Sequence, residues 1–382
     1  MGNLPVYRFQ LTTTLCYGPD SLKALGTLDG QRVLVVTDEF MNSTPVMGRV
    51  RTELAGAAAV EVFDQVKPNP DLTAVTEGLR AFLAFGPEAI VALGGGSPID
   101  TAKAVRKLAL EMGHDLPGGL IVIPTTSGTG SEVTSFAVIT DPHTHTKLPL
   151  TSVAMLPEMA ILDPEAVGIA PPRLTADAGM DAVSHALEAY VAKGSNDFSD
   201  ALAEKALRLA DASLVRCFRD GGDSEAREHQ HNAATMAGIA FQNAGLGIVH
   251  SLSHAIGGSF RVAHGRLNGI LLPVVITFNA GDLGFRPHDI GAVAGRYAAL
   301  AKSLGLSAST ERNLVLALVG WVEKLRKELD MPATLTAGGV DRAAFAAAIP
   351  TLAATAHGDF CTSGNPVAVT EGDLATLLKR IV

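Results

Sequence analysis

The sequence is poor in cysteine, in long apolar runs and in positive charge. Its three cysteines, Cys16, Cys217 and Cys361, lie far apart and are odd in number. They cannot form a disulfide framework, which favours a reducing, cytoplasmic setting. Gly, Pro or charged residues interrupt every apolar stretch before the ~18 residues that a membrane span needs. The first ten residues lack the basic and apolar regions of a secretory signal.

The charge balance excludes a further class of partner. The net charge is −9, and no run of lysine and arginine occurs among the 382 residues. Nucleic acid is therefore not expected as a partner. A chain of this length has room for two domains, each with its own core.

The first half of the chain alternates short β-branched runs with helical sequence. Residues 6–18 have the two-residue alternation of a strand or hairpin. Four later runs suit buried parallel strands, and helices are expected between them, beginning near Pro45 and Asp71. This rhythm predicts an α/β dinucleotide-binding domain over residues 1–173, with a parallel sheet covered on both faces. The four runs are 32–37, 60–64, 89–93 and 120–124.

The second half is predicted to be all-helical. The Pro171-Pro172 pair breaks the chain, and almost everything beyond it has a helical pattern. We therefore expect an all-α domain over residues 174–382, ending in short helices with a loop at 361–367. The predicted longer helices are 175–191, 197–218, 225–241, 246–257, 290–304 and 311–329.

A glycine-rich loop follows the run at 89–93. It reads GGGSPIDTAK from Gly94 to Lys103. Ser97 is expected as the N-cap of a helix, with Pro98 as its first residue and Asp100 in its first turn. Free N–H groups at such a helix start suit a pyrophosphate. The alternative is a plain tight turn, since the G-x-G-x-x-G dinucleotide fingerprint is absent.

Two further features lie at predicted strand ends. The loop PTTSGTGSE, residues 124–132, offers hydroxyls and backbone donors to phosphate, ribose or amide groups, or it is a solvated turn. Asp38 follows the run at 32–37. A carboxylate there accepts both hydroxyls of an adenosine ribose and repels a 2′-phosphate, which favours NAD over NADP. Alternatively, Asp38 caps a helix.

The stretch from Gly179 to Gly265 concentrates metal-binding residue types. Asp181 and His185 share one helix face at a spacing of four, and His250 and His254 repeat that spacing before His264. One carboxylate and several imidazoles suit a divalent transition ion such as Fe, Zn, Co or Ni. The alternative is a helix cap with ordinary histidines. The other seven histidines lie in charged or loop-like sequence: His114, His143, His145, His229, His231, His288 and His357.

Four motifs and a final HG, in this order, resemble those of the iron-containing (group III) alcohol dehydrogenases. The motifs are GGGSPIDTAK, PTTSGTGSE, GMDAVSHALE and GLGIVHSLSHAIGG. FSDALAEKAL (198–207) and TFNAG (277–281) resemble the branch of propanol and ethanol dehydrogenases found in microcompartments. The resemblance implies an N-terminal dinucleotide domain and a helical metal domain, with the active site between them. Three segments depart from the family pattern, at Ala255-Ile256, Ala263 and Val367, which puts substrate preference and loop geometry in question.

The resemblance also implies roles for individual residues. The metal ligands are expected to be Asp181, His185, His250 and His264, whereas His254 lies near the substrate and relays a proton. The expected cofactor-binding residues are Asp38, Asn69, Gly95, Gly96, Ser97, Asp100, Thr125, Thr126, Thr129 and Lys147.

The expected function is an NAD(H)- and iron-dependent alcohol dehydrogenase that reduces short aldehydes such as propanal or acetaldehyde. A zinc-dependent polyol dehydrogenase of the glycerol type is an alternative for the same ligands. A lyase resembling dehydroquinate synthase would need a basic pocket, and the metal-site segments offer only Arg261 and Arg266 for one. A catalytically idle interaction protein is a third alternative. The expected partners are a small alcohol or aldehyde and further copies of the chain, with a cytoplasmic or microcompartment location.

Overall fold

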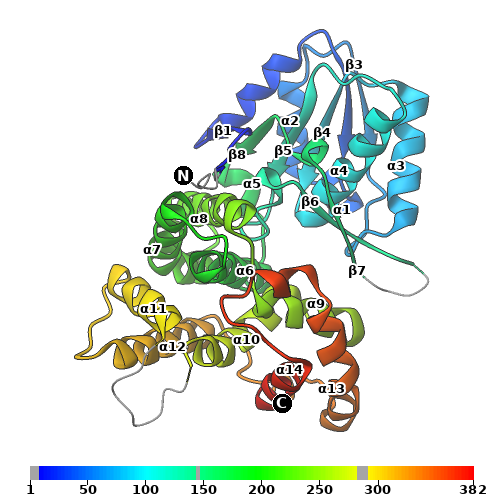
Figure 1. Ribbon diagram of the computed structural model, residues 1–382. Helices are drawn as coiled ribbons and strands as arrows, with labels where there is room; N and C mark the ends of the chain where they lie inside the picture. Colours follow the sequence, from blue (N-terminus) through cyan, green and yellow to red (C-terminus); the bar gives the residue numbers. More distant parts are fainter. Residues whose placement is uncertain (1–7, 143–146, 282–290) are drawn as a thin grey trace, which may run out of the picture.

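The computed structural model describes residues 8–142, 147–281 and 291–382. Among the described residues, all strands lie in an N-terminal α/β part, and helices joined by loops make up the chain from residue 164 onward (Figure 1). This agrees with the predicted fold class. Helix α6 begins at Pro172, next to the predicted domain boundary at residue 173.

A six-stranded parallel sheet forms the centre of the N-terminal part. Its strand order is β1-β8-β5-β4-β2-β3, and all five neighbouring pairs are parallel. The four predicted runs become β2 to β5. Side chains of β2, β4 and β5 are buried on both sheet faces, whereas β3 is an edge strand in which only Phe63 is buried. The strands are β1 (Thr14–Tyr17), β2 (Arg32–Val36), β3 (Ala59–Phe63), β4 (Ala89–Gly94), β5 (Gly119–Pro124) and β8 (Met159–Leu162).

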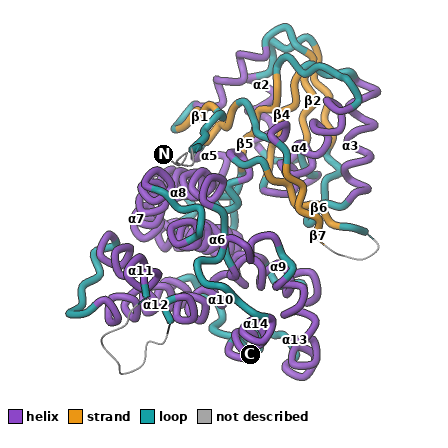
Figure 2. The backbone as a smooth tube through the Cα atoms, viewed as in Figure 1, coloured by secondary structure: helices purple, strands orange, loops and turns teal. Residues whose placement is uncertain are grey.

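Helices cover both faces of this sheet, as Figure 2 shows in purple beside the orange strands. One core includes side chains of the 3₁₀ helix η1, of α2 and of α5, and the other core includes those of α3 and α4. The N-terminal helices are η1 (Ser21–Leu28), α1 (Glu39–Asn42), α2 (Pro45–Glu53), α3 (Leu72–Phe85), α4 (Gly96–Glu111), η2 (Ser131–Val133), η3 (Val153–Met155) and α5 (Pro164–Gly168).

The carboxyl ends of β5, β4 and β2 meet at one edge of the sheet. These strands are direct neighbours, so the loops that follow them lie side by side. The Thr37 hydroxyl donates to the Leu93 carbonyl (2.8 Å), and the Thr125 amide donates to the Gly94 carbonyl (2.9 Å). The three loops singled out in the sequence analysis therefore lie at one edge of the sheet, where parallel sheets bind ligands.

Three strands were not anticipated. β6 (Phe136–Thr140) and β7 (Lys147–Thr151) form an antiparallel hairpin beside the sheet (Figure 1). Phe136, at one end of the hairpin, contacts Phe360 of the helical part, and Lys147, at the other end, contacts Asn69. β8 adds to the sheet by pairing with β1 and β5. These runs are short and lie within turn-rich sequence, so tertiary pairing rather than local pattern forms them. The strand expected over residues 6–18 is shorter than predicted, and its first two residues lie outside the described part.

The C-terminal part is a helical assembly in which α7 and α8 pack on α6. The predicted longer helices are confirmed, with ends shifted by up to three residues. Ile290, the predicted start of one helix, lies outside the described residues. The helices are α6 (Pro172–Val191), α7 (Asp197–Arg219), α8 (Ser224–Ala244), α9 (Ile248–Phe260), α10 (His264–Asn279), α11 (Ala292–Ser303), α12 (Glu311–Glu328), α13 (Arg342–His357), η4 (Phe360–Gly364) and α14 (Glu371–Arg380).

Helix α10 is missing from the sequence prediction. It contains Gly265 and Gly269, and Pro273 lies in its interior. Such residues argue against a helix when only local sequence is considered. Tertiary packing overrides that preference: a Cβ atom at Gly265 would lie 1.7 Å from the Asp177 carbonyl oxygen. Glycine therefore lets α10 approach α6 closely.

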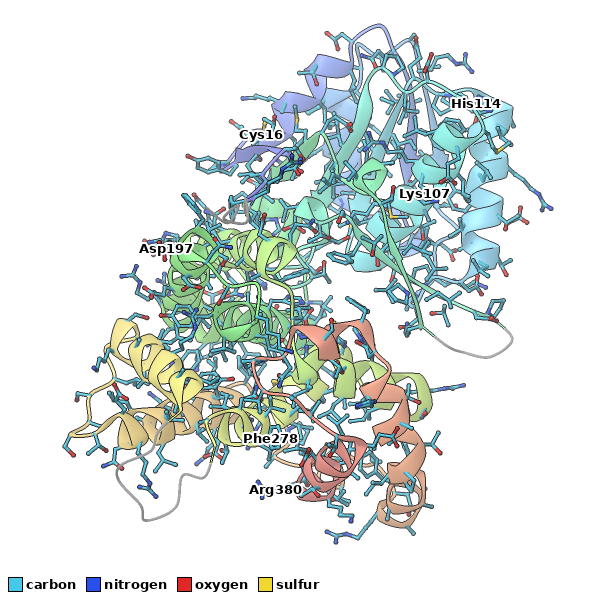
Figure 3. All side chains as sticks on the ribbon, viewed as in Figure 1. Cys16, Lys107, His114, Asp197, Phe278 and Arg380 are labelled. Carbon is cyan, nitrogen blue, oxygen red and sulfur yellow. The ribbon has the colours of Figure 1, made fainter. Side chains whose placement is uncertain are left out.

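Two expected absences concern the described residues only. No helix in the described ranges combines the length and the apolar composition that a membrane span needs. All three cysteines are free thiols, with Cys16 on β1 in the upper part of Figure 3 and the other two buried in the helical part.

Candidate active site

Helix α6 presents a polar face within an otherwise apolar interior. Nearly every residue from Thr175 to Val191 is buried, so α6 runs through the middle of the helical part. Asp181 and His185 are each 5% exposed, and Glu188 follows on the same face one further turn along. Polar side chains this deeply buried need partners, which the neighbouring helices supply.

Imidazoles from three helices surround the Asp181 carboxylate. Its Oδ1 atom lies 3.7 Å from His185 Nε2, 3.7 Å from His250 Nε2 and 3.5 Å from His264 Nε2. Ligand atoms of Asp181, His250 and His264 all lie within 4.8 Å of one another. His185 stacks on the His250 ring at 4.6 Å, beside this set. Three of the four predicted ligands thus form one group, and the fourth, His185, lies beside it within 3.7 Å of Asp181.

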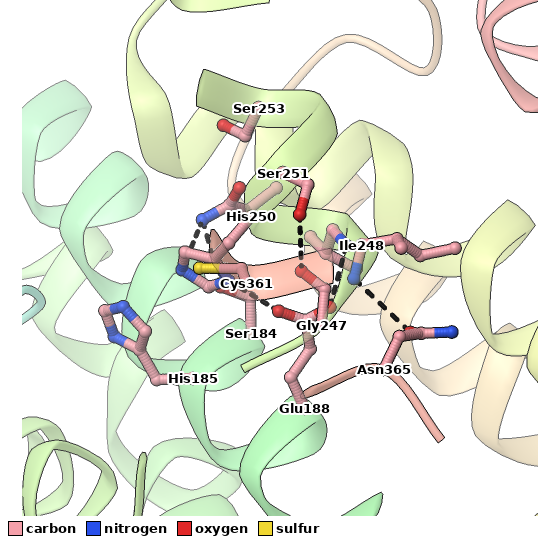
Figure 4. Close-up of polar contacts among 12 residues, drawn as sticks. Ser184, His185, Glu188, Gly247, Ile248, His250, Ser251, Ser253, Cys361 and Asn365 are labelled. Carbon is pink, nitrogen blue, oxygen red and sulfur yellow. Dashed lines mark hydrogen bonds and ion pairs between the residues drawn. The ribbon is translucent and has the colours of Figure 1, made fainter. Parts of the chain in front are cut away.

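The other ring nitrogen of each of these histidines already has a partner. His250 Nδ1 lies 2.6 Å from Glu188 Oε2 (Figure 4). His185 Nδ1 lies 3.2 Å from the Gly128 carbonyl, and His264 Nδ1 lies 2.8 Å from Ser253 Oγ. Such contacts leave the Nε2 atom of each ring on the side of Asp181, which is the usual arrangement around a metal ligand. The donor set therefore fits a divalent ion.

The ionisation of these groups also favours a cation. Burial lowers the pKa of His185 to about 4, so its ring is neutral at pH 7. Burial alone would also lower the pKa of His250, but hydrogen bonds to Asp181 and Glu188 raise it to about 9. Two buried carboxylates thus hold a positive charge between them, and a metal ion supplies that charge when it replaces the proton.

His254 belongs to a second group of side chains. Its Nδ1 lies 2.9 Å from Asp359 Oδ2, and the Phe360 ring stacks on it at a centroid distance of 6.0 Å. His254, Asp359 and Cys361 also have potential ligand atoms within 4.8 Å of one another. His254 stacks on His264 at 5.3 Å, so the two groups are adjacent but distinct.

A cavity of 270 Å³ opens over both groups. Its apolar lining includes Phe136 from the N-terminal part and Phe241, Leu246 and Phe360 from the helical part. The Phe136 and Phe360 rings stack at 5.9 Å across this boundary. The cavity therefore lies between the two parts of the chain, as the sequence analysis expected of the active site.

The glycine loop differs from the prediction at its helix start. Gly95 is the N-cap of α4, no side chain caps the helix, and Ser97 is its second residue. The prediction of Ser97 as N-cap is wrong because Gly94, at φ +151°, turns the chain earlier than expected. A Cβ atom on Gly95 or Gly96 would lie within 3.3 Å of Thr126 or Thr129. Both glycines therefore allow close approach of the second loop.

Asp100 lies in the second turn of α4 rather than the first, and its carboxylate has internal partners. It accepts hydrogen bonds from Ser131 Oγ (2.7 Å) and from the Val138 amide (2.8 Å). The fully buried Lys103 ammonium lies next to it and donates to Ser131, Thr134 and the Phe136 carbonyl. This network anchors the second loop and the β6–β7 hairpin to α4.

The remaining predicted cofactor residues lie at the same sheet edge. Asp38 is the N-cap of α1 and accepts a hydrogen bond from the Met41 amide (2.8 Å), so the helix-cap alternative is observed. Lys147 Nζ donates to Asn69 Oδ1 (2.7 Å), which ties β7 to the loop after β3. Thr125 is buried directly after β5.

Three polar residues near the site were not singled out by the sequence analysis. Glu188 could have been found by its spacing of seven from Asp181. Asn268, which donates to Asp181 Oδ1 (2.8 Å), required recognition of α10. His231 was wrongly placed among the loop-like histidines: it is 1% exposed on α8 and contacts Ser127 Oγ at 3.1 Å. Its polar and charged sequence neighbours gave no signal of that contact.

Family models match both parts of the chain. Residues 12–164 match the model described as iron-containing alcohol dehydrogenase, and residues 175–382 match the C-terminal model of the Fe-containing alcohol dehydrogenase family.

The chain belongs to the iron-containing alcohol dehydrogenase family. It is 37% identical over 376 residues to the 1-propanol dehydrogenase PduQ of Salmonella typhimurium, covering 98% of this chain and 99% of the relative. An NADPH-dependent butanol dehydrogenase of Clostridium saccharobutylicum is 36% identical, with 98% and 97% covered. The solved structure of a 1,3-propanediol oxidoreductase matches with a TM-score of 0.90 at 30% identity, covering 99% of this chain and 100% of that one.

This membership makes the chain an alcohol dehydrogenase, an oxidoreductase that acts on CH–OH groups with NAD or NADP and a divalent metal ion. The predicted enzyme class is confirmed.

Proposed function

We propose that this alcohol dehydrogenase uses NAD(H) and iron to interconvert short primary alcohols and aldehydes, and that it reduces propanal or acetaldehyde. One observation carries the proposal: the aspartate–histidine cluster lies at an apolar cavity that also touches Thr129 of the second cofactor loop. An uncharged substrate in this cavity would lie between metal ligands and cofactor loops.

The cavity suits a small neutral substrate. Its volume is 270 Å³, and aromatic rings form much of its wall. Among the described residues that line it, none is lysine or arginine, so a phosphorylated or carboxylated substrate would find no counter-charge. This argues against the lyase alternative, and the apolar wall offers few hydrogen bonds to a polyol.

The proposed metal ligands are Asp181, His185, His250 and His264. A divalent ion bound there would act as a Lewis acid on the substrate oxygen. Glu188 orients His250, and Ser253 orients His264. The same nitrogen and oxygen donors also suit zinc, so metal analysis belongs to the test of this proposal.

His254 is the proposed proton carrier. It lines the cavity, and its Nδ1 contact with Asp359 leaves Nε2 to exchange a proton with the alcohol oxygen. The chain thus separates two tasks: four side chains hold the metal ion, and a fifth moves the proton.

The loops after β4 and β5 are the proposed pyrophosphate cradle, through Gly95, Gly96, Ser97, Thr126 and Thr129. Their glycines bring two loops within van der Waals contact, and the uncapped start of α4 leaves N–H groups free. The nicotinamide of a bound cofactor would supply or accept the hydride.

The preference for NAD over NADP is proposed from charge. Asp38 and Glu39 follow β2. Glu39 lines a neighbouring hollow, in which Asp64, Asp71 and Glu77 outnumber Lys67 among the charged lining residues. These carboxylates would repel a 2′-phosphate. Asn69 and Lys147, which contact each other, are proposed to bind the cofactor at the same edge.

A homodimer or larger homo-oligomer is also proposed. β1 is an edge strand of the sheet, and Leu11 and Tyr17 beside it are 49% and 67% exposed. An unpaired edge with apolar side chains is a template for pairing with another chain. Enclosure in a microcompartment is proposed from the resemblance to that branch alone, and co-purification with shell proteins from the source cells tests it.

The proposal is tested with protein purified without oxygen and loaded with iron, assayed with NADH and a panel of aldehydes. We expect turnover with two- to four-carbon aldehydes, loss of turnover after chelation and recovery with Fe²⁺. Efficient reduction of a charged aldehyde together with neglect of propanal and acetaldehyde would overturn the substrate assignment. Recovery with zinc alone would overturn the metal assignment.

A further inference from the structure

A second hollow lies on the outer side of the helical part, where α6, α9, α10 and the loop before α13 meet. Its volume is 400 Å³, and its lining includes Arg173, Arg261 and Arg266. Arg173 lies in the first turn of α6, Arg261 ends α9, and Arg266 lies in the first turn of α10. The fold therefore brings three guanidinium groups together from three segments.

The charges in this hollow are only partly compensated. Arg266 Nε donates to Asp177 Oδ1 at 3.0 Å. Within the described ranges, Arg173 and Arg261 form no hydrogen bond or ion pair with another residue. One further carboxylate lines the hollow: Asp341, whose Oδ1 accepts from the Ala344 amide and caps α13. The hollow therefore keeps positive charge and N–H donors that have no acceptor among the described residues.

The backbone around Arg261 has an unusual conformation. Arg261 has a φ of +51°, in the left-handed region that favours glycine. Non-glycine residues in this region concentrate at ligand-binding segments, where the surrounding structure compensates the strain. Gly339, at φ +92°, lets the facing loop turn at the hollow.

We infer that this hollow binds the phosphate group of a small molecule. Two unpaired guanidinium groups match the charge of a phosphate dianion, and their planar forks match its oxygen geometry. A ligand with a single carboxylate would neutralise only one of the two guanidinium charges. The substrate cavity offers no comparable phosphate site, because arginine and lysine are absent from its described lining.

The location links this hollow to the metal site. Residues 261–263 are the whole connection between α9, which carries His250 and His254, and α10, which begins at His264. A phosphate group bound to Arg261 would restrain this connection and with it the His264 backbone. Phosphate binding is therefore expected to strengthen metal retention.

Isothermal titration with inorganic phosphate, at constant ionic strength and with NADH present to fill the cofactor site, tests the inference. We expect one saturable site per chain and at least tenfold weaker binding in the Arg173→Gln, Arg261→Gln double variant. Both side chains are exposed, so the variant is expected to fold, and circular dichroism checks this. Arg219→Gln is the matched control, since Arg219 lines a different basic hollow with Lys324 and Lys327.

Glycerol 3-phosphate distinguishes the source of the group. Tighter binding than inorganic phosphate supports a phosphorylated metabolite, and equal binding supports free phosphate. Absence of saturable binding, or equal weakening by Arg219→Gln, overturns the inference. The titration needs no turnover, so it remains decisive even if the proposed substrate is wrong. If phosphate binds as inferred, chelator competition should show that phosphate slows metal loss from the wild type and not from the double variant.

Discussion

The two parts of the chain build their share of the active site by opposite means. In the N-terminal part, backbone groups form the proposed cofactor site. These groups belong to Gly95, Gly96 and the uncapped start of α4, and side chains such as Lys103 hold the loops in place. The helical part uses side chains, with Asp181 and three histidines projecting from α6, α9 and α10. A binding site formed by backbone groups keeps its ligand contacts when one side chain is replaced, whereas a site formed by side chains loses a contact.

The two parts meet through glycine as well as through the substrate cavity. A Cβ atom on Gly128 would lie 2.6 Å from the Ala178 carbonyl oxygen of α6, and one on Gly130 would lie 2.6 Å from Gly238 of α8. Close packing at Gly128 places its carbonyl on His185 Nδ1. The second loop therefore supports His185 on α6 in addition to its proposed cofactor role, which local sequence did not indicate.

The largest expected effect is loss of a metal ligand. His264→Ala should abolish metal-dependent turnover, by more than the 10- to 100-fold that loss of an outer contact costs. More than a third of the His264 side chain is exposed, so the variant should fold. Metal content and aldehyde reduction are measured together. A His264→Ala enzyme with full metal and full activity would remove His264 from the site. His357→Ala on α13 serves as the control histidine.

The next effect concerns the contact that orients a ligand. Glu188→Gln replaces the carboxylate that lies 2.6 Å from His250 Nδ1, and should weaken metal binding about 10- to 100-fold. Chelator competition measures the affinity. Glu204→Gln is the control, because Glu204 accepts from the Tyr190 hydroxyl away from the ligands. Equal metal affinity in wild type and Glu188→Gln would show that Glu188 is only structural.

A smaller effect is expected at the proposed cofactor site of the N-terminal part. Asp38→Gly should raise kcat/KM for NADPH about tenfold while leaving turnover with NADH largely intact, because it removes one repelling charge. Glycine is a tolerated N-cap, so stability should fall by only a few tenths of a kcal/mol. Thr310→Gly, which removes a cap from α12, controls for that loss. Equal wild-type kcat/KM for NADH and NADPH would contradict the role of Asp38.

The smallest expected effect is on stability at high pH. Burial lowers the pKa of Lys103 to about 8, whereas an unfolded lysine titrates near 10.5. Between these values the unfolded chain binds more protons, so Lys103 makes the free energy of unfolding rise with pH. Urea unfolding from pH 7.5 to 10.5 should show this rise in wild type and not in Lys103→Met. Parallel pH profiles of the two proteins would contradict it.

The sequence predicted most of the fold because the buried strands and long helices follow local rules. The runs at 89–93 and 120–124 are apolar and bounded by turns, and become β4 and β5 as expected. The misses have a common cause. β8 and α10 exist because of what they pack against, so neither periodicity nor propensity marks them.

The site was predictable to the extent that its residues are close in sequence. Asp181 and His185 share a helix turn, and so do His250 and His254. The Glu188 contact and the Asp359 contact with His254 join residues separated by 62 and 105 positions. Contacts of this kind depend on how helices pack, and a single sequence does not contain that information directly.

The location of the bound metal ion tests the account most directly. Crystals of the iron-loaded protein, measured at the iron absorption edge, should show one strong anomalous peak per chain. The account predicts this peak about 2.0–2.2 Å from a carboxylate oxygen of Asp181 and from Nε2 of His185, His250 and His264, with His254 farther away. A peak between His254, Asp359 and Cys361 instead, or a peak without Asp181, would contradict it.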